Sequence, residues 1–135
     1  MIEVNNLTTE RINKVFLKRI AEKVLTAEKK RRTKISLALI EEKEIKKINR
    51  KYRRKNRPTD VLSFDYDNLK EIVICPVAVR RNAKRYNSTF KKELARVLIH
   101  GILHLLGYEH EKNKKKAEIM GKREEEYLKL CQKII

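Results

Sequence analysis

The sequence of 135 residues contains no tryptophan, only two cysteines, two prolines and three glycines. The cysteines, Cys75 and Cys131, are too few and too scattered for a disulfide framework, so we expect reduced, buried thiols. Nothing reads as a linker or an internal repeat, which predicts one domain over residues 1–135. No apolar run approaches the roughly 18–20 residues of a membrane span. The first residues, Met1–Asn6, contain neither the basic region nor the apolar region of a signal peptide, so we expect a cytoplasmic protein.

Acidic residues are also few relative to basic ones. Thirty-five Lys and Arg residues against 18 Asp and Glu residues give a formal net charge of +17. Such a charge attracts polyanions, and nucleic acid is the commonest polyanion of the cytoplasm. A Lys-, Ile- and Asn-rich composition, typical of AT-rich genomes, accounts for part of the lysine content but less for the clustered arginines. The composition therefore favours a nucleic-acid-binding protein.

Hydrophobic periodicity predicts strands interspersed with helices. Strands are expected at Ile2–Val4, 34–40, 60–65 and 71–75, and helices over 9–28, 41–52, from Pro76 onward, and over 90–106 and 112–134. The helix over 90–106 is apolar on most faces, which indicates a central, buried helix. Ser88 or Thr89 can cap its start, and Gly107 is placed to end it in a left-handed conformation. We predict an α+β fold, a small mixed sheet of about four strands with helices packed on it.

All histidines of the chain, His100, His104 and His110, lie between positions 100 and 110. Residues four apart on a helix are about 40° apart around its axis and ~6 Å along it, so His100 and His104 point the same way. Gly107 breaks the helix, and the reversed chain can bring His110 back over the pair. Three neutral imidazoles leave a fourth tetrahedral position open, as in catalytic zinc sites, although imidazole also suits nickel, copper and iron. We predict one metal ion per chain, most simply zinc.

The spacing H-x3-H-x2-G-x2-H is also that of the metzincin proteases, in which a glutamate after the first histidine is the general base. Here that position is Gly101, which has no side chain. Glu109, beside the third histidine, is a carboxylate able to orient a ligand or to move a proton. Met120 is interpreted as a core residue because its spacing with Ala117 and Leu128 is helical. The protease hypothesis therefore lacks its base.

Three segments carry a family resemblance. The run from His100 to His110, HGILHLLGYEH, closely resembles the H-G-x-L-H-L-x-G-Y-D-H signature of the YbeY endoribonucleases. Residues 49–64 are similar to that family's N-x-x-Y-R-x-x-x-x-P-T-D-V-L-S-F motif, and residues 71–75 to its G-D-I-V-I strand. The chain departs from the family pattern at Glu109, where Asp is usual, and at Lys70-Glu71, where Gly-Asp is usual.

The resemblance implies a zinc-dependent, single-strand-specific endoribonuclease that acts in 16S rRNA 3′-end maturation and ribosome quality control. Its partners would be single-stranded RNA, rRNA above all, and the small ribosomal subunit. The matching motif also assigns Arg53 to the catalytic site. A planar guanidinium suits a phosphate and can stabilise charge that develops on phosphorus. A metal site on a very basic domain agrees with an anionic phosphodiester substrate.

Basic residues beside Arg53 are the candidates for contact with the RNA backbone, together with Arg53 itself: Arg54, Lys55 and Arg57. Basic runs are often only solvated faces, so other clusters are weaker candidates: Arg80, Arg81, Lys84, Arg85, Lys112 and Lys114–Lys116. Thr59, Asp60 and Ser63 are expected to shape the loop that carries the motif.

Two other functions stay open from the sequence. A non-catalytic, metal-stabilised ribosome-assembly factor would bind rRNA with steep salt dependence but without turnover. A metzincin-like protease would need a base that Gly101 does not provide.

Overall fold

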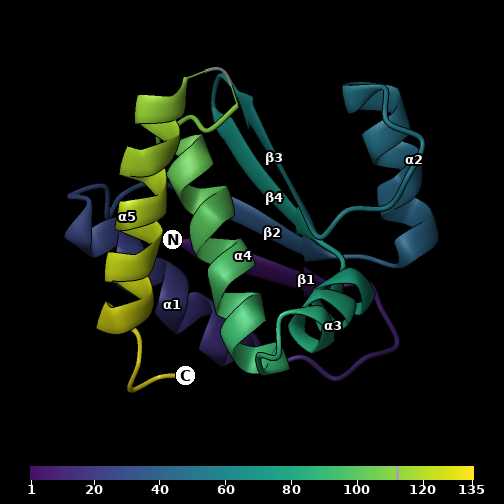
Figure 1. Cartoon of the computed structure of the whole chain (residues 1–135), viewed down its shortest axis with the longest axis horizontal. Helices are drawn as coiled ribbons and strands as arrows, with labels where there is room; N and C mark the ends of the chain where they lie inside the picture. Colours follow the sequence, from purple (N-terminus) through teal and green to yellow (C-terminus); the bar gives the residue numbers. More distant parts are fainter. Residues whose placement is uncertain (112) are drawn as a thin grey trace.

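The computed structural model describes residues 1–111 and 113–135 (Figure 1). Its elements are, in chain order, β1 (Ile2–Asn6), α1 (Lys14–Ala27), β2 (Ile35–Leu39), α2 (Glu42–Arg53), β3 (Val61–Tyr66), β4 (Leu69–Ile74), α3 (Pro76–Arg85), α4 (Phe90–Leu105) and α5 (Lys114–Leu130). This order is the one that the hydrophobic periodicity predicts, and the α+β fold class is confirmed.

Among the described residues the strands form one four-stranded sheet in the order β1-β2-β4-β3. β1, β2 and β4 run parallel, whereas β3 pairs antiparallel with β4. Tyr66 of β3 pairs with Leu69 of β4, so Asp67 and Asn68 make the turn of this hairpin. The mixed sheet is therefore confirmed, and β3 lies at its edge.

Alternation along the strands gives the sheet two covered faces. On one face β2 and β4 contribute aliphatic side chains to the main core beneath α1, α4 and α5: Ile35, Leu37, Leu39, Ile72 and Ile74. On the other face a smaller cluster packs with α2 residues Ile45 and Ile48: Ala38, Leu62, Phe64 and Val73. Figure 1 shows α2 standing apart from the other helices, across the sheet.

Helix α4 is buried along most of its length, as its apolar sequence predicts. None of the helices within residues 1–111 and 113–135, α4 included, is long and apolar enough to cross a membrane. Thr89 caps α4, because its side-chain oxygen accepts a hydrogen bond from the Lys92 amide at 3.1 Å. The helix therefore begins where the sequence predicts.

The end of α4 is a Schellman turn. The Tyr108 amide donates to the Leu103 carbonyl at 3.0 Å, and the Gly107 amide donates to the His104 carbonyl at 3.1 Å. Gly107 has a φ of 103°, a left-handed conformation that favours glycine. The turn reverses the chain immediately after His104, and this reversal directs His110 back toward the helix.

The first helix differs from its prediction. It begins at Lys14 rather than at residue 9, because the Asn13 side chain accepts a hydrogen bond from the Phe16 amide at 3.0 Å and caps it there. Val15, near the start of α1, is 64% exposed. Ile12 packs against the core from the loop before the helix. The last helix ends at Leu130, whereas residue 134 was expected, although Ile134 is buried in the main core.

Both cysteines are free and buried, and burial raises the pKa of the Cys75 and Cys131 thiols. Because the thiolate is the nucleophile, we expect neither thiol of the folded protein to react with iodoacetamide at the rate seen in denaturant. Counting alkyl groups by mass spectrometry against time checks this. Native labelling of either cysteine at its unfolded rate would contradict the burial.

Candidate metal centre and cleft

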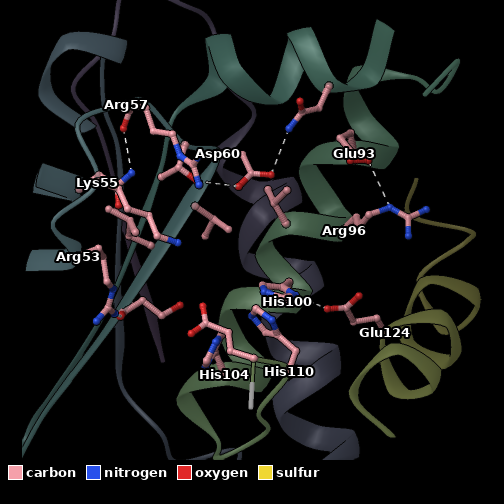
Figure 2. Close-up of a pocket in the computed structure, with 18 of the residues that line it drawn as sticks. Arg53, Lys55, Arg57, Asp60, Glu93, Arg96, His100, His104, His110 and Glu124 are labelled. Carbon is pink, nitrogen blue, oxygen red and sulfur yellow. Dashed lines mark hydrogen bonds and ion pairs between the residues drawn. The ribbon is translucent and has the colours of Figure 1, made fainter. Parts of the chain in front are cut away.

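The three histidines lie together at one end of a cleft (Figure 2). α4 supplies His100 and His104, one turn apart, and the chain after Gly107 supplies His110. One ligand atom from each ring lies within 4.8 Å of the other two, and the ring centroids are 4.8–5.7 Å apart. All three residues are partly buried. This group can hold a metal ion.

A carboxylate from α5 orients the first of these rings. Nδ1 of His100 is hydrogen-bonded to Oε1 of Glu124, whose side chain is only 16% exposed. A His that donates one ring N–H to a carboxylate presents its other nitrogen, Nε2 here, for coordination. Glu124 thus gives His100 the tautomer and the orientation of a metal ligand.

His104 is held in the protonation state that a metal requires. Burial lowers the pKa of His104, and the neighbouring His110 and His100 rings lower it further. The neutral imidazole is the form that binds metals. Three converging imidazoles, one of them paired with a carboxylate, form a donor set that fits zinc.

A partly buried polar cluster anchors the turn that carries His110. The Glu28 carboxylate, at the end of α1, accepts hydrogen bonds from Tyr108 at 2.9 and 3.1 Å and also from Tyr127 of α5. Arg123 lies 3.8 Å from the same carboxylate. Burial and the Glu28 carboxylate raise the pKa of both phenols, so both remain donors at neutral pH. Since Tyr108 is two residues before His110, this cluster fixes the approach of the third histidine.

The absence of a side chain at Gly101 has a structural reason that the sequence did not reveal. A Cβ at this position would lie 3.2 Å from Ile72 Cγ2 and 3.2 Å from Ser63 Oγ, both in the sheet. The Ser63 hydroxyl also donates to the Gly101 carbonyl at 3.1 Å. α4 therefore packs closely on β3 and β4 at this residue. A glutamate side chain here, as in metzincins, would start against the sheet.

We expect Gly101→Ala to be less stable than Gly121→Ala by about 1 kcal/mol or more, since crowding a packed core costs about 1–3 kcal/mol. Gly121 is the matched control: it lies inside α5, and an added Cβ there meets nothing within 4 Å. Gly121→Ala should gain the usual helical preference for alanine, roughly 0.5–1 kcal/mol. Urea unfolding of both variants measures the difference. Equal gains would show that the α4–sheet contact is loose.

The cleft has a volume of about 440 Å³ and extends from the histidines along α4. Among the described residues four basic side chains line it, from α2, the following loop and α4: Arg53, Lys55, Arg57 and Arg96. Arg53 donates from its guanidinium to the Ser63 carbonyl at 2.9 Å, which places it beside β3. Asn49 donates to the Arg57 carbonyl at 2.9 Å and holds the loop against α2. Histidines and basic groups thus face one cavity (Figure 2).

The loop that carries the motif of residues 49–64 is shaped by the residues expected to do so. Thr59, Asp60 and Ser63 all line the cleft. The Asp60 carboxylate accepts from Asn82 of α3 at 3.3 Å and from Thr59 at 3.4 Å. These contacts tie the loop to α3 and shape the far end of the cleft.

Other predicted contact residues lie elsewhere. Arg54, with a φ of 58°, follows α2 and is not among the described residues that line the cleft. Arg80 pairs with Glu10 and Arg81 with Glu42, both at 2.5 Å. Lys84, Arg85, Lys114 and Lys115 also lie outside the described lining. Lys116 lies 3.5 Å from Glu109, whose side chain is 58% exposed. Lys112 lies outside the described residues.

Sequence reasoning missed the carboxylates that line the cleft, Glu93, Glu111 and Glu124, and considered Glu109 instead. A signal existed for Glu124. It follows Met120 by four residues and precedes Tyr127 and Leu128 by three and four, so helical phase places it on the buried face of α5. Glu93 precedes Val97 by four residues and His100 by seven, so helical phase places it on their side of α4.

Comparisons with known proteins agree with this arrangement. The profile of the family described as Endoribonuclease YbeY matches residues 2–132. The Endoribonuclease YbeY of Thermotoga maritima is 44% identical over 97 residues, which cover 70% of this chain but only 65% of that protein, less than two thirds of its length. That of Thermotoga neapolitana is 43% identical over 119 residues, 85% of this chain and 80% of the relative.

A solved structure is similar over almost the whole chain. The solution structure of TM1509 from Thermotoga maritima has a TM-score of 0.69 and 37% identity, covering 95% of this chain and 87% of that one. The family's profile and the relatives named after it therefore agree. The chain belongs to the YbeY family.

Proposed function

We propose that the protein is a zinc-dependent, single-strand-specific endoribonuclease that acts in 16S rRNA 3′-end maturation and ribosome quality control. It would work in the cytoplasm on rRNA of the small ribosomal subunit, as a single domain. The observation that carries the proposal is the convergence of three partly buried histidines at one end of a cleft lined by four basic side chains. The names of the relatives, Endoribonuclease YbeY, support the reaction class.

His100, His104 and His110 would hold the ion, with Glu124 orienting His100. Zinc held by these three imidazoles would supply a Lewis acid and would activate water near neutral pH. The protein's own contribution is to keep the His104 imidazole neutral and to aim the three rings at one point. The lowered pKa of His104 and the Glu28–Tyr108 contact before His110 both serve that purpose.

Arg53 would bind the scissile phosphate. Its guanidinium is fixed by the Ser63 carbonyl and lies 5.2 Å from the Phe64 ring centre, so it is positioned before the substrate arrives. A preorganised guanidinium stabilises charge on phosphoryl oxygens without further reorganisation. Lys55 and Arg57 would hold phosphates along the strand, and Arg54 would contact RNA that extends beyond the cleft.

The experiment that tests this function combines metal content per chain with cleavage of a single-stranded fragment of the 16S rRNA 3′ region. We expect cleavage to stop on chelation, to return with zinc, and to spare the same fragment in a duplex. RNA binding without turnover in any metal would instead favour the non-catalytic assembly factor. Metal-dependent cleavage of casein would support a protease, which the packing at Gly101 disfavours.

A further inference from the structure

Three aromatic rings form a continuous strip outside the cleft, and no role above uses the strip as a whole. We call Tyr52 of α2 with Phe64 and Tyr66 of β3 the aromatic strip. The Tyr52 and Phe64 ring centres are 5.4 Å apart, and the Phe64 and Tyr66 rings are nearly parallel with centres 6.2 Å apart. The two outer rings are exposed, Tyr52 by 50% and Tyr66 by 47%. Exposed aromatics in a row are a feature of binding surfaces.

Cations accompany these rings. The Arg53 guanidinium lies 5.2 Å from the Phe64 ring centre, and the Lys51 ammonium lies 5.3 Å from the Tyr52 ring centre. Arg53 also lines the cleft that holds the histidines. The strip therefore lies beside Arg53, a residue of the cleft, and continues away from it.

The strand geometry explains this continuity. Phe64 and Tyr66 are two residues apart and share one face of β3, whereas Ser63, directly before Phe64, bonds to Gly101 of α4 on the other face. β3 is the edge strand of the sheet. A ligand at Arg53 can therefore pass around this edge, from the cleft on the α4 face to the strip on the α2 face, without crossing a covered strand.

We propose that the aromatic strip is a base-stacking surface for single-stranded RNA whose phosphate backbone is held at Arg53. This proposal rests on the proposed function for its choice of RNA. Every base has a π-face, and proteins that bind single strands combine cations for the backbone with aromatic rings for the bases. Paired bases of a duplex are stacked inside it and cannot reach such rings. The strip thus gives a physical basis for single-strand preference.

Equilibrium binding of labelled oligouridylate tests the strip, measured in a His104→Ala background so that the RNA stays intact. Tyr66→Ala and Tyr52→Ala should each weaken binding by about fivefold or more, as expected when one stacked base is lost. Tyr66→Phe keeps the ring and should bind nearly as the parent does. Leu69→Ala is the matched control, because Leu69 pairs with Tyr66 across the hairpin and is equally exposed, 47%.

Ultraviolet cross-linking of the unmutated protein to oligouridylate gives a readout that does not depend on variants folding. Peptide mapping should find uridine attached within the strip. Unchanged affinity in both alanine variants, equal loss in Leu69→Ala, or cross-links confined to other segments would overturn the proposal and leave the strip as packing or a protein-docking face. RNA binding that depends on the strip, in a protein that cleaves no RNA, would support the stacking surface and contradict the proposed nuclease function. RNA cleavage by the parent, with unchanged binding in the strip variants, would support the nuclease function and contradict the stacking surface.

Discussion

Replacing His104 with alanine is expected to abolish stoichiometric metal binding and to lower RNA cleavage by more than about a hundredfold. Loss of a hydrogen-bond partner of a metal ligand alone typically costs about 10–100-fold in affinity or activity, and loss of the ligand itself costs more. His100 and His110 would remain, and two imidazoles do not make the donor set of a catalytic zinc site. Metal per chain by mass spectrometry and the rRNA-fragment assay measure both effects. A variant with full metal content and full cleavage would refute the assignment.

The same variant also differs from its parent in stability when no metal is present. The difference is in how the free energy of unfolding depends on pH. The pKa of His104 is lowered from its ordinary value of 6.5, so the unfolded chain binds this proton more readily than the folded chain does. The free energy of unfolding of the metal-free parent must therefore fall as the pH drops through about 6.5. His104→Ala lacks this contribution and should lose less stability between about pH 7 and pH 5. An identical pH dependence in both proteins would contradict the lowered pKa.

Local rules were sufficient to predict the histidine group. The i, i+4 spacing placed His100 and His104 on one side of a helix, and the structure has them one turn apart on α4. Gly107 was predicted to end that helix, and its φ of 103° is the conformation that reverses the chain. His110 then approaches the pair because of the turn. These inferences concern short stretches of chain, in which backbone geometry dominates.

Strand pairing, the choice of helix cap and the direction of a loop side chain could not be predicted from hydrophobic periodicity. The sheet order β1-β2-β4-β3 depends on which strands pair, and periodicity within a strand does not encode its neighbour. α1 begins at Lys14 because a single cap at Asn13 outweighs the helical spacing of the residues before it. Glu109 is not among the described residues that line the cleft and pairs with Lys116, whereas Glu111 lines the cavity. The direction of a side chain in the loop after a turn cannot be predicted from its residue type.

Glu124 shows how much of the site depends on helix packing. It is the first of three successive glutamates, a pattern that usually indicates a solvated face. Docking of α5 against α4 turns only this one toward His100, 24 positions away in the chain. Glu125 instead reaches Arg96, and Glu126 pairs with Arg123 at the surface. The three side chains therefore have the same chemistry and different partners.

Glu124→Gln is expected to weaken zinc binding by about 10–100-fold, because a neutral amide replaces the carboxylate that orients His100 and raises its basicity. Glu126→Gln is the matched control: it removes the same charge from the same helix, but its side chain is 60% exposed and contacts no histidine. If long-range charge alone governed affinity, both variants would weaken zinc binding alike. Competition with a chromophoric chelator measures affinity without reference to RNA. An effect confined to Glu124→Gln would show that the α5 carboxylate acts through the His100 ring, and equal effects would reduce Glu124 to a general contribution of charge.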